Sequence, residues 1–268
     1  MIDFLIAITR EAGERVLYES RRIKGKKEGG GNWITEADLA SEKYLTNAIH
    51  QAYNMHHILS DPGYKVLTEE TNNVLKNPEK EPHLWVIDPL DGTTNFTFKL
   101  PLIAISVAYI ENGLTQCGSV YDPFRRELFW AQRNKGAFLN GNRIRVRRAK
   151  NFSGSLVNIG CPYKHEDFIK TYPLGEALHI QGARVVNLGT AALELSYVAC
   201  GRLSLYYEAG LKPWDIAAGK LIVEEAGGYI ESLSGNFSPF SFDNVIASNR
   251  SLINKVKKTF RPLKSKFR

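Results

Sequence analysis

Residues 85–96 (WVIDPLDGTTNF) constrain this chain most, because an apolar, strand-like run leads directly into two acidic residues. Asp88 ends the apolar run, Pro89 fixes the backbone and removes an amide donor, and Asp91 follows on a turn. Both carboxylates can therefore converge on one point beyond the end of the strand. The segment predicts a functional site carried by a rigid strand.

The composition is that of an ordinary globular protein, since 43% of the 268 residues are hydrophobic and 24% are charged. This length allows a substantial core, in one large domain or in two closely packed ones, and the composition excludes disordered and collagen-like chains. Residues 2–22 combine helical spacing with acids, which predicts an amphipathic helix and not an export signal. No apolar run approaches the ~20 residues that a membrane helix needs, so we expect no membrane partner.

The three cysteines are scattered along the chain at Cys117, Cys161 and Cys200. This odd number argues against a disulfide framework and for a reducing, cytoplasmic location. We expect all three to be small core residues.

Positive charge is concentrated in two places. Residues 255–268 hold seven lysines and arginines and no acid, which equals the whole formal net charge of +7. A second basic cluster, residues 143–150 (RIRVRRAK), alternates arginine with apolar residues, which predicts a strand with one solvated face. Solubility and loose attraction to polyanions explain both clusters better than a dedicated nucleic-acid site does.

Two helices are predicted near the start, over residues 2–22 and 36–52. Thr35 and Asp38 form a T-x-x-D capping box at the beginning of the second. The basic, glycine-rich link between them, residues 24–33, lacks the pattern of a nucleotide-phosphate loop and is expected to be mobile.

From residue 84 the pattern changes to strands, at 84–88, 103–113, 114–122, 127–132 and 144–148. Asn112-Gly113 and Asn140-Gly141 supply tight-turn chemistry, which predicts an antiparallel, hairpin-rich sheet. Residues 189–201 and 214–228 then read as helices ended by glycine, interleaved with short strands. Grouped strands followed by interleaved helices indicate a layered, mixed α+β (α/β) protein and not a parallel βαβ series.

Further acids accompany Asp88 and Asp91. Asp215 stands at the start of a strongly apolar helix, and Glu69 and Glu70 precede a polar loop. Taken singly, Asp91 and Asp215 could simply be helix N-caps, and the glutamate pair a solvated turn.

Taken together, the acids predict a metal site. Two unit charges ~4 Å apart repel by ~4 kcal/mol at an effective dielectric constant of 20, so several gathered carboxylates require cations. All these ligands are oxygen, which favours Mg²⁺, or Mn²⁺ in its place, over zinc. The six histidines show no metal or triad spacing, which gives little support to a zinc hydrolase or a Ser-His-Asp enzyme.

These segments give the chain a clear resemblance. WVIDPLDGTTNF, the upstream TEE and the downstream WDIAAGKLIVEEAGG resemble the motifs of the inositol monophosphatase family. GTAALELSYVACGR and YYEAGLKPWDIAAG are most similar to its bacterial extragenic-suppressor-type members. The resemblance covers nearly the whole chain and implies the layered αβαβα sandwich of the sugar phosphatases. It implies a single domain over residues 1–268, with an α+β half at about 1–150, an α/β half at about 151–254 and a basic tail at 255–268.

The resemblance also implies a set of metal ligands. Glu69, Asp88 and the Leu90 carbonyl would bind one Mg²⁺, and Asp88, Asp91 and Asp215 a second. A third, weaker ion would use Glu69. The alignment alone selects Glu69 over Glu70, and the loop before Glu69 is longer than in usual relatives.

Other positions would bind water and substrate. Thr93 would help Glu69 to orient the attacking water, and Asp91, Ala191 and Glu208 would contact polyol hydroxyl groups. Gly92 and the predicted helix N-termini at Thr93 and at Gly189, Thr190 and Ala191 can offer amides to phosphate, although Thr190 and Ala191 could serve only as caps. Asp38 matches an aspartate near the third metal, and Lys27 matches a mobile-loop lysine.

The expected function is Mg²⁺-dependent hydrolysis of myo-inositol monophosphate and related polyol phosphates. The family resemblance implies a homodimer inhibited by lithium. Fructose-1,6-bisphosphatase and 3′-phosphoadenosine phosphatase activities remain alternatives within the same chemistry. An alternative of another class is a regulatory protein that binds RNA or the transcription machinery.

Overall fold

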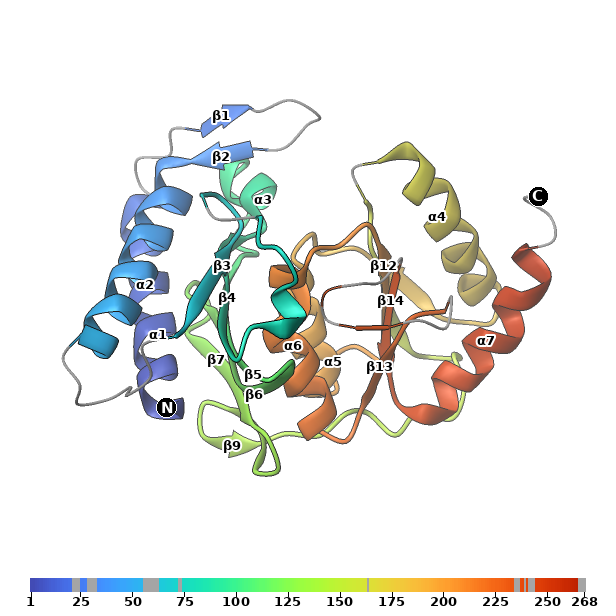
Figure 1. The fold of residues 1–268 in the computed structure, drawn as a ribbon. Helices are drawn as coiled ribbons and strands as arrows, with labels where there is room; N and C mark the ends of the chain where they lie inside the picture. Colours follow the sequence, from blue (N-terminus) through green and yellow to red (C-terminus); the bar gives the residue numbers. More distant parts are fainter. Residues whose placement is uncertain are drawn as a thin grey trace.

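Two β-sheets alternate with layers of helices in the computed structural model (Figure 1). The structure describes residues 1–20, 25–27, 33–54, 63–71, 74–162, 164–233, 237, 238, 240 and 244–264. The layers are, in order, α1 (Ile2–Glu19) with α2 (Glu36–Asn54), the larger sheet, α5 (Ala191–Ala199) with α6 (Pro213–Glu225), the smaller sheet, and α4 (His165–Ile180) with α7 (Arg250–Lys264). This αβαβα order confirms the predicted fold class.

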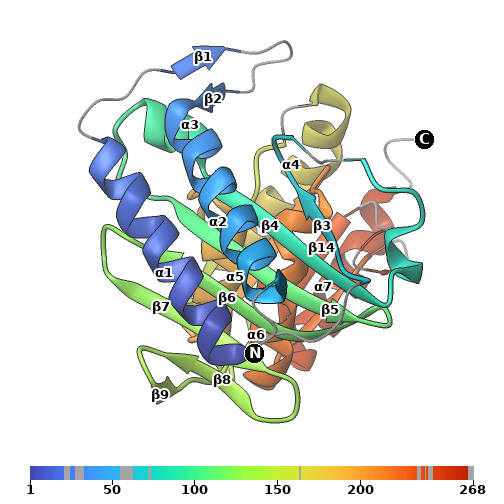
Figure 2. The same cartoon turned by 60° about the vertical axis from the view of Figure 1, so that its left-hand side comes forward.

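The larger sheet has seven strands in the order β3-β4-β5-β6-β7-β8-β9. Its strands are β3 (Lys65–Thr68), β4 (His83–Asp91), β5 (Ala104–Glu111), β6 (Leu114–Asp122), β7 (Glu127–Gln132), β8 (Gly136–Leu139) and β9 (Asn142–Arg143). β3 and β4 are parallel and every other neighbouring pair is antiparallel. Asn112-Gly113 and Asn140-Gly141 have φ between 47° and 82°, so both make the left-handed hairpin turns that the sequence predicts. Figure 2 shows α1 and α2 lying across one face of this sheet.

The smaller sheet has five strands in the order β11-β10-β12-β14-β13. Its strands are β10 (Leu156–Ile159), β11 (Arg184–Val186), β12 (Leu205–Ala209), β13 (Tyr229–Glu231) and β14 (Asn244–Ser248). β10 is parallel to β11 and β12, whereas β14 is antiparallel to β12 and β13. Three short elements remain: α3 (Thr93–Thr97), the 3₁₀ turn Pro78–Lys80, and the hairpin of β1 (Gly25–Lys27) with β2 (Trp33–Thr35).

α6 lies between the two sheets and buries most of its surface, and its partly exposed positions include Lys220 and Glu224, which form an ion pair. Small residues bring its backbone close to its neighbours. A Cβ added at Gly118 on β6 would lie 2.9 Å from the Cα of Ala218, and one at Gly219 would lie 2.7 Å from the Leu195 side chain on α5. This close packing fixes the position of α6, and therefore of Asp215 in its first turn.

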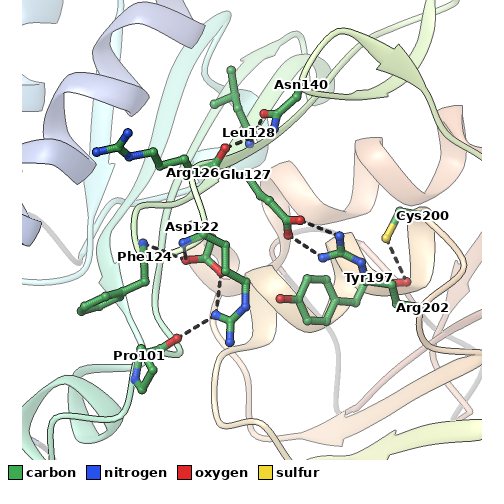
Figure 3. Close-up of polar contacts among 11 residues, drawn as sticks. Pro101, Asp122, Phe124, Arg126, Glu127, Leu128, Asn140, Tyr197, Cys200 and Arg202 are labelled. Atoms are coloured by element: carbon green, nitrogen blue, oxygen red, sulfur yellow. Dashed lines mark hydrogen bonds and ion pairs between the residues drawn. The ribbon is translucent and has the colours of Figure 1, made fainter.

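An ion pair joins the larger sheet to the chain that follows α5. The guanidinium group of Arg202 donates to both carboxylate oxygens of Glu127 on β7, and it lies 4.8 Å from the centre of the Tyr197 ring (Figure 3). Nearby, Asp122 accepts hydrogen bonds from the amides of Phe124 and Arg125, each at 3.0 Å, which orders the turn between β6 and β7.

The sequence analysis was wrong at several places. The first helix ends at Glu19, before residue 22. Residues 144–148 form no strand, because the Ile144 amide donates to Ala137 on β8 whereas the Val146 amide donates to Ala226 at the end of α6. Cys161 is exposed, whereas Cys117 is buried and Cys200 half-buried.

Some elements had no prediction. These are α4, which contains Pro173, α7, which includes the first ten residues of the expected basic tail, and strands β3, β8, β9 and β11. The glycine-rich link contains β1 and the first residue of its partner β2, and residues 28–32 between the two strands lie outside the described residues. Among the described helices, none is both long and apolar enough to cross a membrane.

Gly118→Ala should destabilise the protein by roughly 1–3 kcal/mol, because the added methyl group would meet backbone atoms of Ala218 that cannot rotate away. Gly175→Ala on α4 is the matched control, since its Cβ would find its nearest neighbour at 3.5 Å. That change should be neutral or should stabilise by up to about 1 kcal/mol. Urea unfolding measures both free energies, and equal losses would contradict the close packing of β6 on α6.

Candidate active site

The acids that the sequence singles out come from strand ends at one edge of the larger sheet. Thr68 on β3 is paired with Ile87 on the parallel strand β4, so Glu69 and Asp88 leave the two strands side by side. The pairing of β4 with β5 is irregular between Asp88 and Asp91, where Pro89 interrupts it. Asp215 reaches the same place from the first turn of α6, which packs on β4, β5 and β6.

Burial and neighbouring charges shift the pKa of these carboxylates. Burial raises the pKa of Glu69, Asp88 and Asp215 well above the ordinary range, and repulsion from neighbouring acids adds to the effect. The strongest repulsion on Asp88 comes from Glu69, and that on Glu69 from Asp215. Burial also raises the pKa of Asp91 to about 6, although hydrogen bonds from Thr190, Ala192 and Ala191 oppose it.

Hydrogen bonds from the chain orient three of the carboxylates. Asp88 Oδ1 accepts from the Leu90 amide at 3.1 Å, and Asp215 Oδ2 accepts from the Lys212 amide at 2.6 Å. Asp91 Oδ2 accepts from Thr190 Oγ1 and from the Ala192 amide, both at 2.7 Å. Each of these contacts uses only one oxygen of its carboxylate.

Neither Asp91 nor Asp215 is the helix N-cap that the sequence suggested, because Gly92 is the N-cap of α3 and Lys212 is that of α6, yet both carboxylates accept from amides at a helix start. Asp215 accepts from the amide that precedes α6, and Asp91 caps α5, which lies far away in the sequence. The first amides of α5, expected to face phosphate, are directed to Asp91 instead, and the positive end of the helix dipole stabilises its charge.

Thr93 and Asp38 form a second layer of contacts. Thr93 Oγ1 lies 2.9 Å from Asp38 Oδ1 and 3.0 Å from the Leu90 carbonyl oxygen. Asp38 is fully buried, and its Oδ2 accepts from the Thr35 amide at 2.7 Å and from the Thr35 hydroxyl group. The predicted capping box therefore forms, and it also holds the side chain next to Thr93.

Glu42 is a structural residue that the sequence analysis missed. It is buried on α2 and accepts from the amides of Glu70 (3.0 Å) and Thr71 (3.1 Å), which holds the chain just after β3. The sequence spacing could have indicated this residue, because Asp38 and Glu42 are four positions apart and therefore lie on the same buried face of α2.

Glu194 was missed for a similar reason. It is buried in α5, and it accepts from the amides of Leu188 (2.7 Å) and Gly189 (3.0 Å). Asn95 Nδ2 reaches the Leu188 carbonyl from the other side at 2.7 Å. A single acid in an otherwise apolar helix was the signal that marks it.

Glu208 lies next to this loop on β12. Tyr206 donates its hydroxyl proton to Glu208 Oε2 at 2.6 Å. Burial, together with the charge of Asp91, raises the pKa of Glu208 to about 7, although the hydrogen bond from Tyr206 opposes this shift. A Cβ at Gly160 would lie within 2.4 Å of the Glu208 side chain, so any larger residue at position 160 would clash with this carboxylate.

The donor set fits a hard divalent cation. Four carboxylates repel one another without any neighbouring His or Cys, and cations relieve such repulsion. Within the described part of the chain, no three acidic, His or Cys side chains are already arranged around a metal position. Binding would therefore require these side chains to adjust. Lys27 lies on β1, and its side chain, like residues 55–62 of the loop before β3, lies outside the described residues.

Fold and site together define a five-layered α/β protein with a cluster of acids at its central strand ends. The chain matches the inositol monophosphatase family over residues 1–264, and it belongs to that family. It is 36% identical over 257 residues to the Nus factor SuhB of Escherichia coli K12, covering 94% of this chain and 92% of that protein.

Solved structures agree with this assignment. The extragenic suppressor protein SuhB of Bartonella henselae is 30% identical, with a TM-score of 0.85 over 96% of this chain and 97% of that one. An IMPase of Thermotoga maritima is 31% identical, with a TM-score of 0.85 over 98% of both chains. The resemblance read from the motifs is confirmed.

Without divalent ions, the melting temperature should fall as the pH rises from 5 to 8. A carboxyl group whose pKa is higher in the folded chain than in the unfolded chain contributes to stability, and this contribution is fully present below pH ~4, the unfolded-state pKa. It is lost as the pH rises to the folded-state pKa. That value is about 6 for Asp91 and about 7 for Glu208. Mg²⁺ should raise the melting temperature more at pH 8 than at pH 5.5, because protons compete for the same oxygens. Calorimetry should show that the melting temperature of Asp91→Asn falls less steeply with pH than that of the wild type. Equal slopes would contradict the raised pKa assigned to Asp91.

Proposed function

We propose that this protein is a Mg²⁺-dependent phosphomonoesterase that hydrolyses myo-inositol monophosphate and related polyol phosphates. One observation carries the proposal: four mutually repelling carboxylates meet where β3, β4 and α6 present them to one space. Membership of the inositol monophosphatase family and the likeness to an IMPase support it.

In this proposal Glu69, Asp88 and the Leu90 carbonyl hold one ion, and Asp88, Asp91 and Asp215 hold another. A third ion would use Glu69, and Mn²⁺ can replace Mg²⁺. The bound ions would neutralise charge on the phosphoryl group and the leaving oxygen, and would lower the pKa of a water molecule.

Thr93 and Glu69 would orient the attacking water. When Thr93 donates its proton to Asp38 Oδ1, its oxygen is left to accept a hydrogen bond from that water. Asp38 can impose this direction because the Thr35 amide and hydroxyl group fix its other oxygen. The two residues thus set the line of attack on phosphorus.

Backbone groups would receive the phosphate and hold the loops around it. Gly92 has φ 93°, and a Cβ there would lie 2.9 Å from the Leu102 carbonyl oxygen, so only glycine allows this close approach. Asn95 and Glu194 hold the Leu188–Gly189 loop opposite, next to Thr190.

Glu208 would select a polyol. Its carboxylate can accept hydrogen bonds from sugar hydroxyl groups, together with Asp91 and a contact from Ala191, and it would repel a second phosphate. This charge disfavours the fructose-1,6-bisphosphatase and 3′-phosphoadenosine phosphatase alternatives. The expected homodimer, cytoplasmic location and lithium inhibition belong to the same proposal.

Asp91→Asn should lower Mg²⁺-dependent turnover by about 100-fold or more, because it removes a metal ligand while its amide oxygen can still cap α5. Glu208→Ala is the matched variant, and should raise KM for inositol monophosphate by about 10-fold while leaving a generic aryl phosphate unaffected. Released phosphate is measured for a panel of esters with and without Mg²⁺ and Li⁺. Near wild-type turnover by Asp91→Asn would refute the site, and an equal KM change for both esters would refute the polyol role.

A second candidate function is binding to RNA or to the transcription machinery. The likeness to a Nus factor favours it. The structure places Lys255, Lys257 and Lys258 on α7, where Lys257 is paired with Glu231 while Lys255 and Lys258 are exposed.

Substitution tests this candidate better than truncation, because Val256 in the same helix is fully buried. Lys255→Gln with Lys258→Gln should weaken a salt-sensitive RNA gel shift by several-fold while phosphatase activity is retained. An RNA shift that is absent in wild type, or unchanged in the double variant, would remove the support from these lysines.

A further inference from the structure

A basic hollow lies outside the acid cluster. The loop of residues 147–155 surrounds a cavity of about 310 Å³, at the lower end of the range for small-molecule sites. Its lining residues are Arg147, Arg148, Ala149, Lys150, Asn151, Ser153, Gly154 and Ser155. This loop continues the basic cluster that the sequence analysis singled out and that phosphatase chemistry does not use.

The backbone of this loop is held at both ends. Asn249 Nδ2 donates to the carbonyls of Arg147 (2.8 Å) and Ala149 (2.9 Å). At the far end, the Gly154 amide donates to Gly182 at 3.1 Å and the Ser155 amide to Phe152 at 2.9 Å. The cavity is therefore framed by chain that several elements hold in place.

The basic side chains of residues 145–150 face solvent, because the apolar residues between them pack against the protein core. Ile144 and Val146 pack on the core around α6, and Ala149 packs on the core beneath the smaller sheet. The intervening side chains of Arg145, Arg147 and Arg148 are exposed, as is that of Lys150. The alternation read from the sequence therefore does give one solvated face, although no strand forms.

The cations around the cavity lack acidic partners. Within the described ranges, Arg147, Arg148 and Lys150 form no ion pair. No Asp or Glu occurs in the sequence between Glu127 and Glu166. Glu231, at the end of β13, is already bound by Arg250 and Lys257 of α7. Three adjacent positive charges repel one another, and an anion between them removes that repulsion.

We propose that the loop of residues 147–155 is a second, non-catalytic site that binds the phosphate group of a ligand. Arginine guanidinium groups match phosphate oxygens with paired N–H donors, and Lys150 adds a point charge. Ser153 and Asn151 supply neutral hydrogen-bonding groups at the rim. The ligand is either a small phosphorylated molecule or the phosphate backbone of a nucleic acid, since both present the same group.

This site lies well away from the acid cluster. The Val146 amide donates to Ala226, just past the C-terminal end of α6, whereas Asp215 lies in the first turn of the same helix. At 1.5 Å per residue, those two positions are ~17 Å apart along the helix axis. In Figure 1 the chain after β9 passes below α6, at the opposite end from α3. The two sites can therefore be changed independently.

The test compares two triple variants of equal charge change in the full-length protein. One carries Arg147→Gln, Arg148→Gln and Lys150→Gln, and the control carries Lys43→Gln, Lys76→Gln and Lys80→Gln at exposed positions elsewhere. Calorimetric titration with inorganic phosphate is done without added divalent ions, so that the repelling carboxylates bind no phosphate. Anisotropy with a labelled single-stranded oligonucleotide forms the second arm.

We expect saturable binding of at least one probe by wild type, weakened about 10-fold or more in the loop variant and within twofold of wild type in the control. Saturation by phosphate alone identifies a small ligand, and loss of oligonucleotide binding alone identifies a nucleic-acid backbone. Absence of saturable binding of both probes, or equal binding by both variants, overturns the proposal. Mg²⁺-dependent hydrolysis should stay within twofold of wild type in both variants. The hydrolysis assay therefore tests the phosphatase proposal independently of the binding assays that test this loop.

Discussion

Mutual repulsion among buried carboxylates is the constraint on which this structure depends. Burial and repulsion from neighbouring acids raise the pKa of Glu69, Asp88 and Asp215, and burial raises that of Asp91, so the folded chain holds these carboxylates together at a cost in free energy. Donors from the backbone and from hydroxyl groups offset part of this cost and fix one oxygen on three of the four. The remaining repulsion is what gives a divalent cation its binding energy in the proposed function.

Two further buried acids support the arrangement without belonging to it. Glu42 holds the chain after β3, and Glu194 holds the loop before α5, each by accepting two backbone amides. Ionic hydrogen bonds to backbone amides are strong and directional, so they position loops where apolar packing cannot. The site is thus built by carboxylates of two kinds, those that face the common space and those that hold the chain around it.

α6 separates two regions of opposite charge. Its first turn carries Asp215 into the acid cluster, and the chain beyond its last turn contacts the segment that begins the basic loop. The helix can occupy this position because Gly118 and Gly219 let its backbone approach β6 and α5. A closely packed, largely buried helix therefore keeps acids and cations apart, so that each cluster keeps an electrostatic potential that suits its own ligand.

The sequence by itself determined the local features. Apolar periodicity gave the main helices and strands, Asn-Gly pairs gave two hairpin turns, and the spacing of acids around Pro89 gave the strand end that carries Asp88 and Asp91. Only the tertiary structure decided that Asp91 caps α5, that Glu42 and Glu194 hold loops, and that residues 144–148 join β8 to the end of α6 without forming a strand. The reason is physical: periodicity and turn chemistry act between residues a few positions apart, whereas the partner of a buried polar group is chosen by packing between distant segments.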